Sequence, residues 1–459
     1  MTERYFAALA AVVLVASLAG AAVAATEDSS GERRVEGWSP DVPDVHDVEE
    51  PAGDGVATVG DREFDSVQAA VDAAEPGETI VLEGRFDERV TVDTPGVTLE
   101  AVERDAAVID GGEEGTVVEV VADDVTVEGV WIRNSGYDKN VDDSGVLVNG
   151  SSATLSELRL TEIAFGIWIG SVDDVTVEDS RIAGREDVQT VQRGNGIHLW
   201  ETTDAELRNN SITTVRDGIY YQWAEGIHAA ENAMWDMRYG VHYMYSNDNV
   251  LEGNVAFDND VGYALMVSYD LTMRGNVAVN NDGTSGHGIL LKDVEDSEIV
   301  GNELVGNDNG LYVYNAQDNR LTDNLLLENA VGVHITAGSS GELVTGNSFL
   351  GNDEAAFAET TSQTSWNGTE RGNYWADART VDLDEDGIGD TRYRPAGAVE
   401  RLTHEHPQAA VFAESPAFDA VRLAESSFPV VESPGIVDQR PLAEPPHDNW
   451  RDYYADHDH

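Results

Sequence analysis

The chain has 459 residues, of which 87 are acidic and 27 basic, so its formal net charge at pH 7 is −60. Because like charges repel, this excess excludes a nucleic-acid backbone or an anionic membrane surface as the main partner. Apolar residues make up 41% of the chain and recur periodically, which favours a halophilic globular protein over a disordered acidic polymer. There is no cysteine, so any metal has to be held by His, Met, Asp or Glu.

The chain begins with an apolar run at residues 6–24, which follows Arg4 and ends in Ala22-Val23-Ala24. This arrangement is typical of an export signal, so we predict a signal peptide over residues 1–25 and an acidic linker over 26–60. The run is also long enough to remain as an uncleaved anchor. Either outcome places the rest of the chain outside the cytoplasmic membrane, in a periplasm-like space.

A helix is predicted after the linker, where Asp65 or Ser66 can cap a segment whose apolar residues follow a helical period. Pro76 and Gly77 end this helix before a strand at residues 79–82. A stack of repeats needs such a cap, because its first unit otherwise exposes an apolar interior and an unpaired strand edge.

The middle of the chain repeats with a period of about 22 residues. Each repeat has a glycine followed by a strand that alternates apolar and polar residues, and a second series of asparagines runs 14 residues behind the glycines. A unit of this length fits one coil of a parallel β-helix with short strands. We therefore predict an all-β fold, a right-handed parallel β-helix over residues 61–375, in which the asparagines form hydrogen-bonded stacks at the corners. The repeat glycines are Gly145, Gly166, Gly196, Gly218, Gly240, Gly262, Gly288, Gly310 and Gly332, and the asparagines are Asn210, Asn232, Asn254, Asn276, Asn302, Asn324 and Asn347.

The second and fourth residues after each repeat glycine are predicted to point out of the coil, since strand side chains alternate. These positions define two columns of outward side chains, and we predict that they form a partner-binding face. The second-position column holds Trp168, His198, Tyr220, His242, Ala264, Leu290, Tyr312 and His334. The fourth-position column holds Trp200, Gln222, Met244, Met266, Lys292, Tyr314 and Thr336.

Three soft donors are expected to lie close together in these columns, namely His242, Met244 and Met266. His242 and Met244 lie two residues apart on one strand, and Met266 lies one coil further along the stack. An imidazole with two thioethers suits Cu(I) far better than the oxygen-seeking ions Mg²⁺ and Ca²⁺. The alternative is that the methionines are ordinary adaptable contact residues. Tyr243 and Tyr245 are expected to point into the coil.

Two insertions interrupt the 22-residue period, one around residues 184–191 and one around 282–285. Both precede strands of the predicted face, so we expect them to form the lips of a cleft. An enzyme acting on polysaccharides would need paired carboxylates or a metal with a basic group here. No acidic pair stacks between adjacent coils at these positions, which weakens that alternative, although the aromatic columns would serve polysaccharide binding equally well.

The C-terminal part is predicted as a capping segment over residues 376–445 and an acidic, histidine-containing tail over 446–459. His404, His406 and the final "HDH" could scavenge a metal, but we expect this tail to be solvated. Asp382, Asp384, Asp386 and Asp390 alternate around a glycine as in a calcium-binding loop. The loop is incomplete, because Tyr393 stands where a bidentate glutamate is expected.

The ordered segments "YGVHYMYSND", "VGYALMVS", "GILLKD", "GLYVYNA" and "VGVHITAG", followed by "GNYWAD", "DEDGIGD" and "SPGIVDQRPL", resemble the NosD family over about residues 55–445. The resemblance implies a non-catalytic, exported β-helix protein that helps to assemble the copper sites of nitrous oxide reductase. It also implies an ABC transporter, made of a membrane permease and a cytoplasmic ATPase, and a copper-delivering lipoprotein as partners. The charge of −60 and the acidic tail depart from the family pattern, so its electrostatic contacts are not carried over. The alternative function is binding or cleavage of a polysaccharide.

Overall fold

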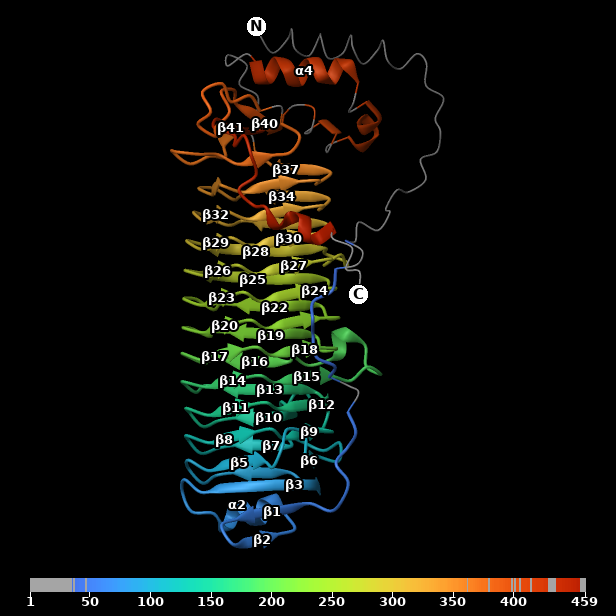
Figure 1. The fold of residues 1–459 in the computed structure, drawn as a ribbon, viewed down its shortest axis with the longest axis vertical. Coiled ribbons are helices and arrows are strands. Elements are labelled where there is room, and N and C mark those ends of the chain that lie inside the picture. Colours follow the sequence, from blue (N-terminus) through green and yellow to red (C-terminus); the bar gives the residue numbers. More distant parts are fainter. Residues whose placement is uncertain are drawn as a thin grey trace.

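The computed structural model describes residues 35, 38–45, 48–360, 362–378, 380–397, 399, 402–403, 406–412, 415–427 and 435–454. Over this part the chain winds into an all-β parallel β-helix whose coils stack along one long axis (Figure 1). The predicted export signal lies outside the described residues. Within the described part, every helix is too short or too polar to cross a membrane.

The N-terminal end of the stack is closed by a hairpin and a short helix. Strands β1 (Val56–Val59) and β2 (Arg62–Phe64) pair antiparallel, and β1 also pairs with β3 (Thr79–Asp87). Helix α2 (Val67–Ala73) is capped by Ser66, whose side chain accepts a hydrogen bond from the backbone N–H of Ala69. The predicted cap is thus confirmed, with Ser66 as its capping residue, and the hairpin begins inside the segment predicted as linker.

One face of every coil belongs to a twelve-stranded parallel sheet, which carries the predicted partner-binding face (Figure 1). Its strands are β4 (Val90–Val92), β7 (Val118–Val120), β10 (Ser144–Val148), β13 (Phe165–Gly170), β16 (Ile197–Trp200), β19 (Asp217–Gln222), β22 (Tyr239–Met244), β25 (Val261–Tyr269), β28 (His287–Glu295), β31 (Asn309–Tyr314), β34 (Val331–Ile335) and β37 (Glu354–Ala358).

The other two faces form one 26-stranded sheet, because β3 pairs with strands of both. One face consists of β5 (Thr98–Ala101), β8 (Thr126–Glu128), β11 (Thr154–Ser156), β14 (Thr176–Glu178), β17 (Glu206–Arg208), β20 (His228–Ala230), β23 (Val250–Glu252), β26 (Thr272–Arg274), β29 (Glu298–Val300), β32 (Arg320–Thr322) and β35 (Leu343–Thr345). The other consists of β6 (Ala107–Asp110), β9 (Trp131–Arg133), β12 (Arg159–Ile163), β15 (Arg181–Gly184), β18 (Ser211–Thr213), β21 (Ala233–Trp235), β24 (Val255–Phe257), β27 (Val277–Val279), β30 (Glu303–Val305), β33 (Leu325–Leu327), β36 (Ser348–Leu350) and β39 (Tyr374–Trp375).

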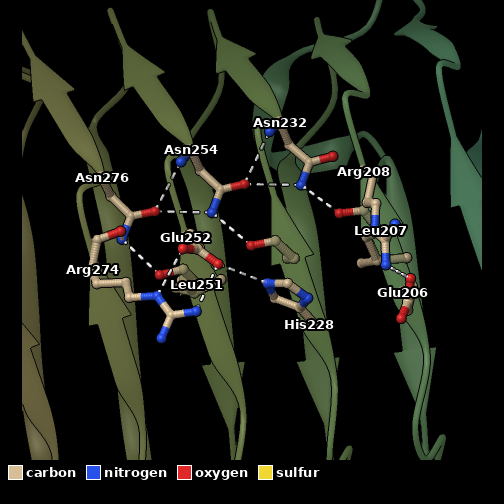
Figure 2. Close-up of polar contacts among 11 residues, drawn as sticks. Glu206, Leu207, Arg208, His228, Asn232, Leu251, Glu252, Asn254, Arg274 and Asn276 are labelled. Atoms are coloured by element: carbon tan, nitrogen blue, oxygen red, sulfur yellow. Dashed lines mark hydrogen bonds and ion pairs between the residues drawn. The ribbon is translucent and has the colours of Figure 1, made fainter.

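The asparagine series forms a continuous buried ladder, as predicted. The side-chain amide of Asn232 donates to Oδ1 of Asn254, and Asn254 donates in the same way to Asn276, each at 2.9 Å (Figure 2). Each amide also donates to a backbone carbonyl of the preceding coil, as Asn254 does to Ala229. The series continues to Asn373, and a second ladder, which the sequence analysis missed, joins Asn259, Asn281, Asn307, Asn329 and Asn352.

The repeat glycines are explained by the close approach of neighbouring coils. A Cβ on Gly240 would lie 2.6 Å from the carbonyl oxygen of Gly262, and the other repeat glycines meet their neighbours in the same way. Between the strands, many turn residues adopt a positive φ, and most of these are Asp or Asn, which tolerate that conformation. The turns therefore account for part of the acidic composition.

The C-terminal end of the stack is closed by a small sheet of β38 (Gln363–Ser365), β40 (Tyr393–Ala396) and β41 (Gly435–Asp438). Buried Asp438 accepts hydrogen bonds from the backbone N–H of Asn373 at 2.7 Å and from Nε1 of Trp375 at 2.9 Å. The "GNYW" and "GIVDQR" segments are therefore two halves of one structural cap. Helix α4 (Pro416–Ser427) and the 3₁₀ turns η1 (Thr190–Gln192), η2 (Pro407–Phe412) and η3 (Asn449–Tyr454) complete the described helical elements.

Two segments predicted to be loose are packed against the β-helix instead. The N-terminal segment runs along its flank (Figure 1): the N–H of Val35 donates to Asn280, and the ring of Trp38 packs on Phe257 and Tyr453. Part of the predicted C-terminal tail is packed as well, because His447 bonds to Ser348 and Tyr453 is buried. The reason is an apolar patch on the outer side of the coils, which these aromatic residues cover; its buried members are Phe257, Val279, Val305, Leu325 and Leu327. His404 and residues 455–459 lie outside the described residues.

Candidate functional site

The second-position column forms a ladder of contacting rings on the twelve-stranded sheet, in which Trp168 and His198 are stacked and the other pairs meet edge to face. Ring centroids are 3.7 Å apart between Trp168 and His198, 4.8 Å between His198 and Tyr220, and 4.8 Å between Tyr220 and His242. These side chains leave the coil on its outer side, as the alternation predicts. The neighbouring rings nevertheless cover the two histidines, so that both are buried. The ladder stops at Ala264.

His242 is held by a buried carboxylate. Asp217, which has no exposed surface, lies 3.1 Å from Nδ1 of His242 and forms a two-bond ion pair with Arg238 at 2.8 and 2.6 Å. Burial alone would raise the pKa of Asp217, but the hydrogen bonds from His242 and Arg238 outweigh it and lower this pKa to about 2. An ionised Asp217 accepts a hydrogen bond from the Nδ1–H of His242, which turns Nε2 away from the carboxylate. This is the arrangement that orients metal-ligating histidines.

Met244 and Met266 are half-buried and occupy adjacent rungs of the fourth-position column. Met244 pairs with Gln222 on one side, and Met266 pairs with Lys292 on the other. The N–H of Tyr245 donates to the carbonyl of Met266 at 3.4 Å, which fixes the two methionines as neighbours along the stack. The structure therefore brings both thioethers to the same outer side as His242, and the donor set fits Cu(I) as a cargo.

His198 lies in a different environment from His242. Burial lowers its pKa to about 3, so it is neutral over the physiological range, and its Nε2 is buried without a hydrogen-bond partner. Its Nδ1 lies 3.1 Å from the side-chain amide of Asn195. The rings of Trp168 and Tyr220 pack on either side of His198, so His198 contributes to the ring ladder as a packed, buried side chain.

The remaining predicted face residues fall into two groups. Trp200 and Gln222 are half-buried beside the methionines, whereas Tyr314 and Lys292 are exposed further along the column. A second ring cluster lies beyond Leu290, where the ring of Tyr312 is 4.5 Å from His287 and 4.8 Å from His334. Burial lowers the pKa of His287 to about 4. The predicted partner-binding face therefore lies on one continuous sheet, but its aromatic rings form two separate clusters.

Tyr245 does not point into the coil, contrary to the prediction. Tyr243 is buried and stacks on Tyr221 at 4.0 Å between centroids, but Tyr245 is 46% exposed and has a φ of 57°. The strand ends at Met244, and the positive φ of the next residue breaks the alternation on which the prediction depended.

The two insertions do border a common groove. It has a volume of about 490 Å³ and lies in the turns that lead into the sheet, beside the second-position column rather than over it. Arg238, which holds Asp217, reaches its wall. Its lining is mainly charged and comprises Glu186, Thr190, Arg193, Thr214, Asp236, Met237, Arg238, Asp258, Asn259, Asp260, Asp282 and Gly283.

The predicted calcium loop brings three carboxylates together. Oxygens of Asp382, Asp384 and Asp386 lie within 4.8 Å of one another. Asp390 folds back onto the same loop and accepts a hydrogen bond from the N–H of Leu383 at 2.7 Å. Repulsion from Asp386 raises the pKa of Asp384. Occupation of this loop by calcium stays a prediction.

Asp217, Arg216 and Arg238 were missed from the sequence. The available signal was their position, since Arg216-Asp217 and Arg238-Tyr239 directly precede two consecutive repeat glycines. Arginines so placed are unusual in a chain with only 27 basic residues.

Fold and site together define a β-helix whose outer face carries an oriented histidine, two thioethers and aromatic rings. The family model for "Periplasmic copper-binding protein (NosD)" matches residues 178–380. The chain is 35% identical over 409 residues to a "Probable ABC transporter binding protein NosD" of Pseudomonas aeruginosa, covering 85% of this chain and 94% of the relative. It is 34% identical over 357 residues to the protein of the same name from Stutzerimonas stutzeri, covering 74% and 81%.

This chain belongs to the NosD family. Its fold is also similar to the A-module of the mannuronan C-5 epimerase AlgE6 of Azotobacter vinelandii, with a TM-score of 0.53 at 15% identity, over 64% of this chain and 93% of that one. That likeness concerns the β-helix architecture alone.

Proposed function

We propose that this protein is a non-catalytic accessory factor that works outside the cytoplasm in assembling the copper sites of nitrous oxide reductase. Its partners in this proposal are the reductase, an ABC transporter with its permease and ATPase, and a copper-delivering lipoprotein. Membership of a family described as periplasmic and copper-binding, with relatives named for an ABC transporter, supports the proposal. The observation that carries it is the orientation of His242 by Asp217 beside Met244 and Met266.

In this proposal copper is a transient cargo. Cu(I) would be held by Nε2 of His242 and by the two thioethers, because soft donors favour this ion over the hard cations. The ionised Asp217 keeps the proton of His242 on Nδ1, so that the ring needs no rearrangement to bind. Both methionines are half-buried and keep some exposed surface, which leaves the ion accessible for transfer.

Polysaccharide binding is the second candidate, because exposed rings such as Tyr314 on a β-helix can stack on sugars. Polysaccharide binding, however, leaves the thioethers of Met244 and Met266 beside His242 without a function. The two candidates differ in a simple property, since only the copper proposal requires sulfur at positions 244 and 266.

The test is the copper content of the reductase made in cells that carry variants of this chain. The variant His242→Gln/Met244→Leu/Met266→Leu removes the donors, and Met→Leu keeps nearly the same side-chain volume. The matched control is Met234→Leu/Met273→Leu, which changes two methionines in the core of the coil. We expect reductase without copper in the first case and loaded reductase in the second. Fully loaded reductase beside a well-expressed donor variant would refute the proposal.

A further inference from the structure

Three bulky residues occupy a backbone conformation that such residues rarely adopt. From Gly166 to Gly310, the fifth residue after the repeat glycine has a positive φ. In three consecutive coils this residue is Trp223, Tyr245 or Val267, with φ values of 54°, 57° and 53°. In neighbouring coils the same position holds Ser171, Glu201, Asp293 or Asn315. Among the described non-glycine residues with positive φ, all but these three and Thr214 are Asp, Asn, Glu or Ser. A bulky or β-branched residue is disfavoured there.

These side chains gain little from packing that would offset the strain. Trp223, Tyr245 and Val267 are 45%, 46% and 36% exposed, and Tyr269 beside them is 48% exposed. The ring of Trp223 contacts Trp200 at 4.9 Å and Tyr245 at 6.1 Å between centroids. We call Trp200, Trp223, Tyr245, Val267 and Tyr269 the Trp223 patch. Its rings at Trp200, Trp223 and Tyr245 contact one another, and Val267 holds the same position in the next coil. Exposed apolar side chains thus gather on a chain of net charge −60, and such patches mark interaction sites.

The backbone does not require these residues. The N–H of Trp223 donates to the carbonyl of Met244 at 3.1 Å, and the N–H of Tyr245 donates to that of Met266. These ladder bonds involve only the main chain, so asparagine would preserve them and would relieve the strain. Side chains that reduce the stability of the fold and are exposed to solvent are best explained by a contact with another molecule.

The patch is continuous with the candidate copper site, because Tyr245 follows Met244 and Val267 follows Met266. Any protein that brings a metal ion to those thioethers has to touch it. The edge of the patch is acidic, with exposed Glu201, Glu225, Asp248 and Asp270. This edge would repel a second copy of the chain and attract a partner with lysines and arginines around its contact area.

We propose that the Trp223 patch is the docking surface for the protein that delivers Cu(I) to His242, Met244 and Met266, a partner with an apolar contact area and a basic rim. This inference rests on the proposed function. A polysaccharide fits less well, because Val267 and the two methionines offer its hydroxyl groups no hydrogen bonds.

The test uses the full chain and the purified copper-delivering lipoprotein as the probe. The variant Trp223→Asn/Tyr245→Asn/Val267→Asn should bind this probe at least about tenfold more weakly, as expected for truncated aromatic anchors. Its thermal unfolding midpoint should rise, which a damaged fold would not show. Ser171→Asn, at the same position two coils away, is the control and should bind normally. Binding by the wild type should also weaken as salt is raised.

The copper site itself is measured separately, by competition with a chromophoric Cu(I) chelator. We expect the asparagine variant to keep its Cu(I) affinity, and the His242→Gln/Met244→Leu/Met266→Leu variant to lose it but still dock. If both variants keep their Cu(I) affinity, the proposed copper site is refuted, but the docking surface is not. The inference would be overturned if the wild type and the asparagine variant bind the probe equally, or if neither binds it. It would also be overturned if the patch instead mediates self-association or polysaccharide binding.

Discussion

Replacing Asp217 by asparagine is expected to weaken both the fold and the orientation of His242. A pKa of about 2 against an ordinary 3.8 corresponds to ~2.5 kcal/mol of stabilisation of the ionised carboxylate. The variant loses this contribution and leaves Arg238 partly buried without its ion-pair partner. Breaking a fully buried pair costs about 3–5 kcal/mol, but the Arg238 side chain is 29% exposed, so the smaller figure is the appropriate one.

The expected change in the unfolding midpoint follows from the size of the chain. With an unfolding entropy of about 2.1 cal/mol/K per residue, a loss of ~2.5 kcal/mol lowers the midpoint by about 3 °C if the whole β-helix unfolds together. A smaller cooperative unit gives a larger shift. The contribution is present above the ordinary pKa of 3.8 and is lost as the pH falls toward about 2, so the variant and the wild type should converge in that range.

The assay is thermal unfolding followed by circular dichroism at high salt, from pH 7 down to pH 2. The control is Asp204→Asn, which removes the same charge from an exposed turn residue with a φ of 54°. We expect the control to unfold like the wild type at every pH. An Asp217→Asn protein as stable as this control at pH 7 would show that the ion-pair reasoning is wrong.

Three further predictions concern stability. Asn254→Leu removes four side-chain hydrogen bonds and leaves their buried partners without a bond, at a cost of ~1–3 kcal/mol for each such group. It should therefore lower the unfolding midpoint more than Asp217→Asn does. An unchanged midpoint would mean that the ladder is dispensable. Burial raises the pKa of Glu342 to about 7, so the folded state loses stability as the pH rises from about 4.5 to 7. When unfolding midpoints are measured over a pH series, Glu342→Gln should be more stable than the wild type at pH 8 and equal to it at pH 4. Lowering the salt from about 2 M to about 0.1 M should destabilise the protein, because its charge of −60 is then less screened; native circular dichroism and an unchanged midpoint at low salt would contradict the halophile interpretation.

The repeat pattern predicted the fold because its signals are local and recur in every coil. The glycines mark close approaches between coils, and the asparagines mark a ladder that needs the same residue at the same place each time. The N-terminal cap was predictable for a similar reason, since Ser66 and the helix it caps lie next to each other in the sequence.

What could not be predicted depends on contacts between segments distant in the chain, or on a break in the alternation. The tail docks through Tyr453 onto a patch whose need for cover is invisible in the sequence. The columns gave the directions of His242 and Met244, but not the burial of His242 beneath neighbouring rings or its contact with Asp217, 25 residues earlier. Tyr245 was misplaced because its positive φ follows from the turn of the coil, which no single residue type announces.

The most direct test of the copper proposal is X-ray absorption spectroscopy on the purified protein loaded with one equivalent of Cu(I). The proposal predicts one nitrogen and two sulfur ligands for the wild type, and loss of the sulfur contribution in Met244→Leu/Met266→Leu. The core variant Met234→Leu/Met273→Leu should give the wild-type spectrum. A copper environment of nitrogen and oxygen only, or the same sulfur signal after replacement of Met244 and Met266, would contradict the assignment of these residues as the copper-handling site.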